Sequence, residues 1–173
     1  MMKLIKIGKI VNTHGIKGEI KILSNFPYKD YVFLKGMTIY IGKDNREVIQ
    51  SYRRHKNFDM ITLQGYDNIN DVLKYKGKMV YVDSTDIKLP NDSYLDEELI
   101  GLTVIYENKA HGIIDGIERY NKVVLFSVLY DGKQYLLPYN KEIIDKVDLD
   151  SGKIYIKDIK GFFDNDLAIK DNI

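Results

Sequence analysis

The stretch IGKIVNTHGIKGEIKI, residues 7–22, decides the fold because polar and apolar side chains alternate on both sides of a turn. Period-two alternation is typical of β-strands with one buried face. The two glycines, Gly15 and Gly18, allow the chain to reverse, which leaves His14 and Lys17 at an exposed tip. The stretch therefore predicts a β-hairpin at the start of the chain. Its two strands are predicted at Leu4–Val11 and Gly18–Leu23.

The same pattern continues through the first half of the chain, where Gly, Asn and Asp separate short strand-like runs. One helical stretch interrupts them: Asp67 or Asn68 can cap it and Gly77 can end it. Six strands and one short helix predict a small closed barrel, since closure removes the edges of a sheet. The remaining strands of this half are predicted at Met37–Ile41, Glu47–Arg54, Met60–Gln64 and Met79–Val82.

The second half is also rich in strand signals. Asp131-Gly132 between two apolar runs predicts a two-residue hairpin turn, and residues 140–147 have the apolar spacing of one or two helical turns. The fold class is therefore all-β, with two small β-barrel units, the second of them a barrel or half-barrel. Strands are predicted at Leu102–Tyr106, His111–Ile117, Val123–Tyr130, Gln134–Pro138 and Lys153–Lys157. The predicted divisions are a first domain at 1–86, a linker at 87–93, a second domain at 94–165 and a flexible tail at 166–173.

Charge is divided unevenly between the two halves. Residues 1–88 hold 16 Lys and Arg against 9 Asp and Glu, a net charge of +7, whereas residues 89–173 hold 10 against 16, a net charge of −6. A basic half joined to an acidic half favours one module that faces nucleic acid and one that faces protein. Ordinary variation of surface charge is the alternative.

Composition excludes several classes of protein. The chain has no cysteine, which rules out disulfides, thiol catalysis and cysteine-ligated metals, and which fits a reducing compartment. No segment approaches the roughly 18 apolar residues of a membrane span, and the N-terminus lacks the features of a signal peptide. We therefore expect a cytoplasmic protein without a membrane partner, and we expect it to be a monomer.

No sequence motif predicts catalysis. Phosphate-binding and dinucleotide-binding glycine motifs are absent, as is the serine-nucleophile motif of hydrolases. The three histidines, His14, His55 and His111, lie far apart and lack the spacing of metal ligands. We predict no catalytic residue, no metal and no cofactor. An RNA-modifying enzyme that uses His14 as acid or base stays open as an alternative, and so does a stand-alone RNA-binding barrel.

Basic side chains mark the candidate RNA-binding surface. A block of four at the end of a predicted strand enters a turn, where it can reach phosphates without disturbing a core. The lysines of the first strand, Lys3, Lys6 and Lys9, are equally well explained as protection of an edge strand. Tyr94 and Leu95 follow the linker, where an aromatic side chain either packs between domains or anchors a protein partner. The RNA-binding or ribosome-binding candidates are His14, Lys17, Arg53, Arg54, His55 and Lys56.

These segments together resemble the RimM family of ribosome maturation factors. The opening stretch is similar to the family's N-terminal signature, and RRHKNFDMITLQGYDNINDV (53–72) with LKYKGKMVYV (73–82) resembles the end of its first domain. Beyond the linker, YLDEELIGLTV, HGIIDGI and YLLPYNKEIIDKVDLDSGKIYI resemble a PRC-barrel domain, and IKGFFD lies where that domain ends. The family often has two adjacent aromatic residues where this chain has Ser93-Tyr94, and Phe162 stands where a leucine is expected.

The resemblance implies a non-enzymatic assembly factor with an N-terminal barrel and a C-terminal PRC-barrel. Members of the family bind the immature small ribosomal subunit, support maturation of its head and promote processing of 16S rRNA. The PRC-barrel is implicated in binding ribosomal protein number nineteen of the small subunit. The charge division agrees with this, because an acidic domain suits a basic ribosomal protein and a basic domain suits RNA.

Overall fold

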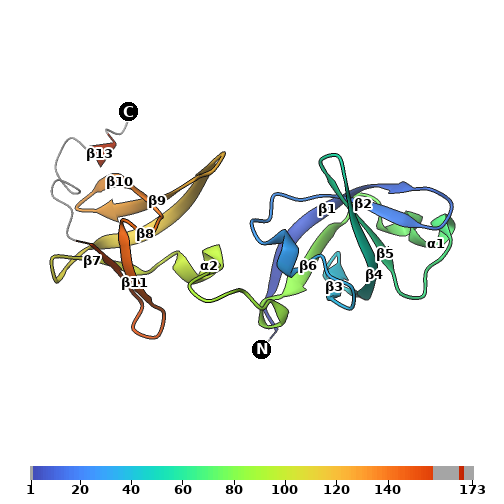
Figure 1. Ribbon diagram of the computed structural model, residues 1–173, viewed down its shortest axis with the longest axis horizontal. Helices are drawn as coiled ribbons and strands as arrows, with labels where there is room; N and C mark the ends of the chain where they lie inside the picture. The colour runs from blue at the N-terminus through green and yellow to red at the C-terminus, as the bar shows by residue number, and fades with distance from the viewer. Residues whose placement is uncertain (1, 158–167, 170–173) are drawn as a thin grey trace. The chain divides into compact units, whose positions relative to one another are not determined.

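The structure is a computed structural model that describes residues 2–157 and 168–169 (Figure 1). The chain divides into two compact units, Met1–Pro90 and Asn91–Ile173. Strands dominate both units, which confirms the all-β fold class. The predicted domain and linker boundaries stay predictions, and the end of the predicted second domain, 158–165, lies outside the described residues. So does the predicted tail, except for residues 168–169.

The first unit is the predicted six-stranded barrel. Its strands follow the order β1-β2-β5-β4-β3-β6, and β6 pairs with β1 to close the barrel. Because β1 has a neighbour on both sides, the interpretation of Lys3, Lys6 and Lys9 as edge-strand protection is wrong. The strands are β1 (Leu4–His14), β2 (Glu19–Leu23), β3 (Thr38–Ile41), β4 (Asn45–His55), β5 (Phe58–Leu63) and β6 (Met79–Asp83).

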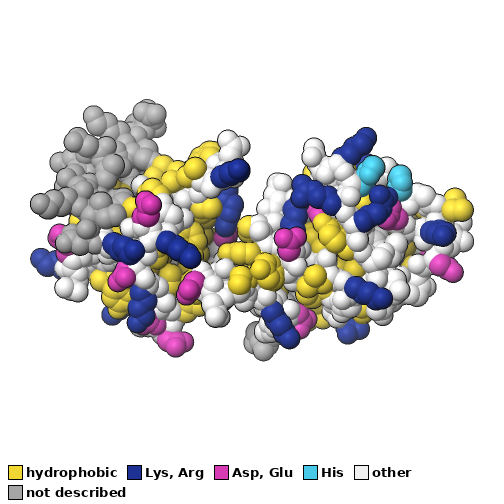
Figure 2. Space-filling model, viewed as in Figure 1, with side chains coloured by type: hydrophobic (Ala, Val, Ile, Leu, Met, Phe, Trp, Pro, Cys, Tyr) yellow, Lys and Arg dark blue, Asp and Glu magenta, His cyan; other side chains and the backbone are white. Residues whose placement is uncertain are grey.

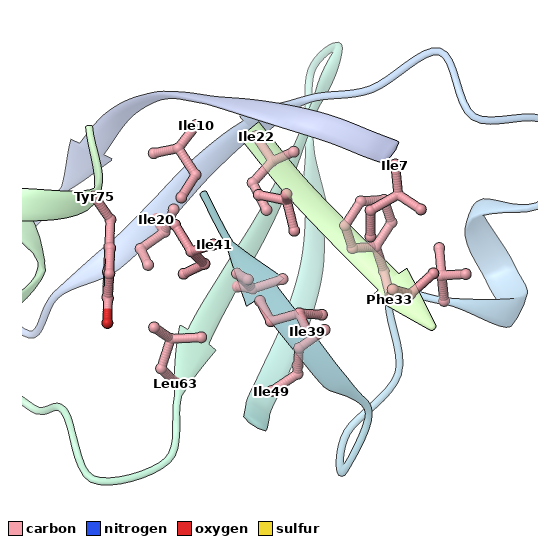
Figure 3. Close-up of a cluster of buried hydrophobic side chains, with 14 of the residues drawn as sticks. Ile7, Ile10, Ile20, Ile22, Phe33, Ile39, Ile41, Ile49, Leu63 and Tyr75 are labelled. Atoms are coloured by element: carbon pink, nitrogen blue, oxygen red, sulfur yellow. The ribbon is translucent and has the colours of Figure 1, made fainter. Parts of the chain in front are cut away.

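The alternation of apolar and polar side chains along the strands divides them between the interior and the exterior of this barrel. Successive residues of a strand point to opposite faces, so the isoleucines of β2 face inward while Glu19 and Lys21 remain partly exposed. Each fully buried aliphatic side chain contributes about 1.5–3 kcal/mol relative to an exposed one. Figure 3 shows the resulting core, whose labelled side chains are Ile7, Ile10, Ile20, Ile22, Phe33, Ile39, Ile41, Ile49, Leu63 and Tyr75.

The helix predicted after residue 67 is confirmed. The side chain of Asn68 accepts a hydrogen bond from the Asn70 N–H at 2.9 Å and caps α1 (Ile69–Val72). A 3-10 turn, Leu73–Tyr75, continues the helix, and Gly77 follows with a positive φ of 85°. The predicted cap and stop residues therefore both have the roles expected of them.

The second unit is one seven-stranded sheet with the order β11-β12-β7-β8-β9-β10-β13, in which β12 and β7 run parallel. The predicted turn at Asp131-Gly132 joins β9 to β10, and both of its residues have positive φ, as this type of two-residue hairpin requires. A short helix, α2 (Asp96–Leu99), precedes the sheet. The strands are β7 (Thr103–Tyr106), β8 (Lys109–Tyr120), β9 (Val123–Tyr130), β10 (Lys133–Pro138), β11 (Ile144–Asp148), β12 (Lys153–Ile156) and β13 (Ala168–Ile169).

The helical prediction for residues 140–147 is wrong. Only a turn forms there: the Asn140 carbonyl accepts a hydrogen bond from the N–H of Ile144 at 2.9 Å, and β11 begins at that residue. The apolar spacing of this segment fits either structure, and pairing of β11 with β12 decides between them. The three side chains expected to face inward from a helix, Ile143, Ile144 and Val147, still pack against the core of the second unit.

One charged side chain is fully buried in the first unit. Asp59 has 0% relative exposure, and its carboxylate lies 2.9 Å from the ammonium of Lys29 and accepts a 2.7 Å hydrogen bond from the Tyr52 hydroxyl. Burial, together with this bond to the carboxylate, raises the pKa of Tyr52 to about 12. Asp59 follows the inward period of Ile61 and Leu63 on β5, so the strand pattern itself places the carboxylate inside.

We expect Asp59→Ala to lower the free energy of unfolding by about 3 kcal/mol, because it leaves the ammonium and the hydroxyl without their acceptor. Urea unfolding of the full chain, with amide hydrogen exchange on β2 and β5 as the local readout, measures the change. Asp44→Ala, in the exposed turn before β4, is the control and should stay within about 0.5 kcal/mol of the parent. Equal stabilities for the two variants would contradict a structural role for the buried carboxylate.

Candidate nucleic-acid interface

The loop between β1 and β2 is held against α1. The N–H of Ile69 donates a hydrogen bond to the carbonyl of Ile16 at 3.0 Å. Gly18 has a φ of +85°, and a Cβ at this position would lie 3.1 Å from the carbonyl oxygen of Asn68. Gly15 also has a positive φ, of +69°, but it faces open space. The loop therefore requires Gly18 for close packing as well as for backbone conformation, and it leaves Ile16 83% exposed.

Two histidines that lie far apart in the sequence come together on the barrel. His14 ends β1 and His55 ends β4, and their ring centroids are 6.2 Å apart with an angle of 32° between the planes. His14 is exposed and His55 is half-buried. Figure 2 shows cyan histidine side chains on the first unit beside dark-blue Lys and Arg side chains. The structure thus joins two candidates that the sequence placed in separate motifs.

An ion pair lies next to these rings. Arg53 donates two hydrogen bonds to the carboxylate of Glu19, from Nε at 2.8 Å and from Nη2 at 2.6 Å. These bonds lower the pKa of Glu19; partial burial opposes the shift, and the charges of Arg53, His14 and His55 add to it. Arg53 is therefore paired with a carboxylate, so the basic block is less uniformly cationic than its sequence indicates. The place of Arg53 among the RNA-binding candidates stays a prediction.

A third ring continues this surface. Phe58, the first residue of β5, pairs across the hairpin with His55, and the ammonium of Lys21 lies 4.0 Å from the centre of its ring. A cation held over an aromatic face in this way is attracted by the π-electrons of the ring. We call His14, His55 and Phe58 the ring surface.

The other cationic candidates differ in their surroundings. Arg54 donates from Nε to the carbonyl of Lys56 at 3.4 Å. Lys56 is exposed at the turn between β4 and β5, with a φ of +55°. Lys17 is exposed on the loop between β1 and β2 and takes part in none of the contacts that join the ring surface. Arg54 and Lys56 are therefore the cations of the basic block that remain available to an anionic ligand.

The two protein-binding candidates lie at the start of the second unit. Leu95 is only 6% exposed, and its N–H donates to the Glu98 carboxylate at 2.8 Å, which caps α2. Tyr94 is half-buried and packs against the core of the second unit. Leu95 thus packs inside its own unit in this structure. Of the two protein-binding candidates, Tyr94 is the more exposed.

The surroundings of His14 bear on the enzyme alternative. His55 and Glu19 lie near His14, but His14 itself is exposed on the outside of the barrel. A hollow of about 410 Å³ in the first unit is lined by other residues, among them Tyr31, Met37 and Lys88. Among residues 2–157 and 168–169, no group of three or more His, Cys, Asp or Glu side chains could hold a metal ion. An open surface of rings and cations is arranged for contact with flat and anionic groups.

The described part of the chain contains no helix that is both long and apolar enough to cross a membrane.

The candidate residues named from the sequence do not include Glu19, Lys21 or Phe58, although Lys21 adds to the basic charge of the first two strands and Phe58 follows the basic block. The signal for the first two was present, because Glu19 and Lys21 occupy the outward period of β2. Their partners on β4 and β5 lie too far along the chain for any local pattern to reveal. Only the strand order β1-β2-β5-β4 brings these residues together.

Comparisons with known proteins cover both units. Residues 5–87 match the family described as the RimM N-terminal domain, and residues 96–162 match the RimM PRC barrel domain. A protein of an Exiguobacterium species named ribosome maturation factor RimM is 33% identical over 171 residues, which cover 95% of this chain and 99% of that protein. A Staphylococcus haemolyticus protein of the same name is 36% identical over 166 residues, with coverage of 92% and 99%. The solution structure of the N-terminal domain of RimM from Thermus thermophilus aligns with a TM-score of 0.45 at 18% identity, over 51% of this chain and 98% of that domain.

We expect Gly18→Ala to destabilise the first unit by about 2 kcal/mol, since it combines a strained φ with a tight 3.1 Å approach of the new Cβ to the Asn68 carbonyl oxygen. Gly15→Ala is the matched control: its φ is also positive but its surroundings are open, so a loss of about 1 kcal/mol is expected. Thermal unfolding followed by hydrogen exchange at Ile69 measures both. Equal losses would show that backbone conformation alone, and not packing on α1, selects glycine.

The ion pair predicts a pH dependence of stability. The pKa of Glu19 is lower in the folded protein than its ordinary value of 4.5, so its contribution is complete above that pH and disappears in more acidic solution. We expect Glu19→Gln to be less stable than the parent at neutral pH, and the difference to shrink as the pH falls below 4.5. Paired urea titrations across this range measure it. A difference that stays constant would mean that the carboxylate charge is irrelevant to the pairing with Arg53.

Proposed function

Because this chain belongs to the RimM family of ribosome maturation factors, we propose that it binds the immature small ribosomal subunit and promotes maturation of the head and processing of 16S rRNA. It acts as a binding factor rather than as an enzyme. The first unit contacts rRNA, and the second contacts ribosomal protein number nineteen of the small subunit.

One observation carries the RNA contact: rings and cations from separate strands of the first unit meet on one outer surface. His14 and His55 lie together there, next to Lys21 and the basic turn with Lys56. Aromatic rings and cations are the two kinds of group that proteins use to bind RNA without reading a duplex. The net charge of +7 on residues 1–88 adds long-range attraction for a polyanion.

The second unit has the opposite charge. Residues 89–173 have a net charge of −6, which favours a basic protein surface and disfavours RNA. Tyr94 is half-buried at the start of this unit. An aromatic side chain fixed on one side by its own core loses little freedom when its other side is covered by a partner.

The enzyme alternative is less well supported. General acid or base catalysis by His14 needs a pocket that holds a substrate against the imidazole and excludes water. His14 lies instead on an exposed surface. The stand-alone RNA-binding barrel remains a distinct alternative, because it makes the second unit dispensable for association with precursor subunits.

Co-purification from cells tests the function. The tagged protein is expected to bring down precursor small subunits that contain ribosomal protein number nineteen, and Tyr94→Ala is expected to reduce their recovery several-fold. Tyr139→Ala is the matched control, because Tyr139 packs against the same core in the second unit and its loss imposes a comparable destabilisation.

Equal losses for the two variants would assign Tyr94 a purely structural role. Recovery of metabolites or of mature polysomes, in place of precursor subunits, would overturn the proposal as a whole. Full recovery by the first unit alone would favour the stand-alone barrel.

A further inference from the structure

We propose that the ring surface binds unpaired RNA bases by stacking, so that the first unit recognises single-stranded rather than duplex RNA. This inference rests on the proposed function, because it takes the ligand to be RNA. To the proposed function it adds the kind of RNA that is bound and the side chains that select this RNA.

The ring surface is built from three strands. His14 comes from β1, His55 from β4 and Phe58 from β5, and the last two are direct neighbours across a hairpin. The two imidazoles are tilted neighbours, with centroids 6.2 Å apart and an angle of 32° between their planes. Bases of every kind have a flat π-face, so such rings hold single strands with little regard to sequence.

The charge at the centre of this surface is nearly balanced. The carboxylate of Glu19 is bonded to the guanidinium of Arg53, and Glu19 lies close enough to both histidines to interact with them electrostatically. An ion pair with no net charge gives a phosphate little attraction, whereas stacking of a neutral base on the rings does not depend on net charge. The centre therefore favours bases over the sugar–phosphate backbone.

Cations lie over and beside the ring surface. The Lys21 ammonium lies 4.0 Å from the centre of the Phe58 ring, and Lys56 is exposed at the turn that follows His55. Phosphates of a strand whose bases rest on the rings can reach these groups, and each phosphate neutralised by a cation releases counterions. Bases at the centre and phosphates at the margin are the arrangement that a splayed single strand requires.

A duplex fits this surface poorly. In an A-form helix the base faces are covered by their neighbours, and proteins meet chiefly phosphates and 2′-hydroxyls. The rings would then have no exposed base to stack on, and the phosphate backbone would meet an ion pair with no net charge. The surface is therefore expected to bind single strands more tightly than duplexes.

The test uses the full chain and two RNAs with equal numbers of phosphates, one an unstructured single strand and one a blunt duplex. Fluorescence anisotropy gives the dissociation constants, and 2-aminopurine in the single strand reports stacking by quenching. The paired substitution His14→Ala with His55→Ala is expected to weaken single-strand binding about ten-fold, to abolish the quenching and to leave duplex binding unchanged. The pair His14→Phe with His55→Phe keeps the rings and should retain both signals.

Two lysines at hairpin turns provide a matched control for charge. Lys56 and Lys43 are both exposed and both have positive φ, at opposite ends of β4. Lys56→Gln is expected to weaken binding of both RNAs and to reduce the salt dependence of association. Lys43→Gln should change neither.

Equal affinity for single strand and duplex would overturn the inference, as would a Phe pair that binds as weakly as the Ala pair. Failure to bind either RNA, with normal recovery of precursor subunits, would also overturn it: the surface would then face protein, and the proposed function would stand. Loss of subunit recovery by the parent protein would reject the proposed function itself.

Discussion

The closure of six strands around an isoleucine-rich core is the constraint on which the rest of the first unit depends. Each strand alternates between the interior and solvent, so a strand that delivers Ile20 and Ile22 to the core must present Glu19 and Lys21 outside. The order β1-β2-β5-β4 then sets these outward residues beside the ends of β1 and β4. The candidate interface is therefore formed by the outward faces of the strands whose inward faces form the core.

Local patterns in the sequence were sufficient for most elements. Alternation located the strands, the Asp131-Gly132 pair located a hairpin, and Asn68 located the start of α1, because each signal depends on neighbouring residues alone. The helical prediction for residues 140–147 was wrong because the structure of this segment does not depend on neighbouring residues alone. Its apolar spacing fits two structures, and the choice is made by β12, which lies further along the chain.

The candidate site was predicted only in part, because its defining contacts are not local. The basic block and His14 were identified, yet the sequence could not show that Glu19 pairs with Arg53 or that the two imidazoles lie 6.2 Å apart. Ion pairs of this kind join residues from different hairpins. Their effect is to divide a block that looks uniformly cationic into one neutralised guanidinium and two free cations, which changes the chemistry that the surface offers.

The attachment of the β1–β2 loop to α1 has a consequence for recognition. The loop loses conformational freedom during folding, because the Ile16 carbonyl accepts a hydrogen bond from Ile69 and Gly18 packs against Asn68. A ligand that meets this loop does not have to order it and so keeps more of the contact energy as affinity. In this way α1, which contributes no side chain to the ring surface, fixes the conformation of the β1–β2 loop beside that surface.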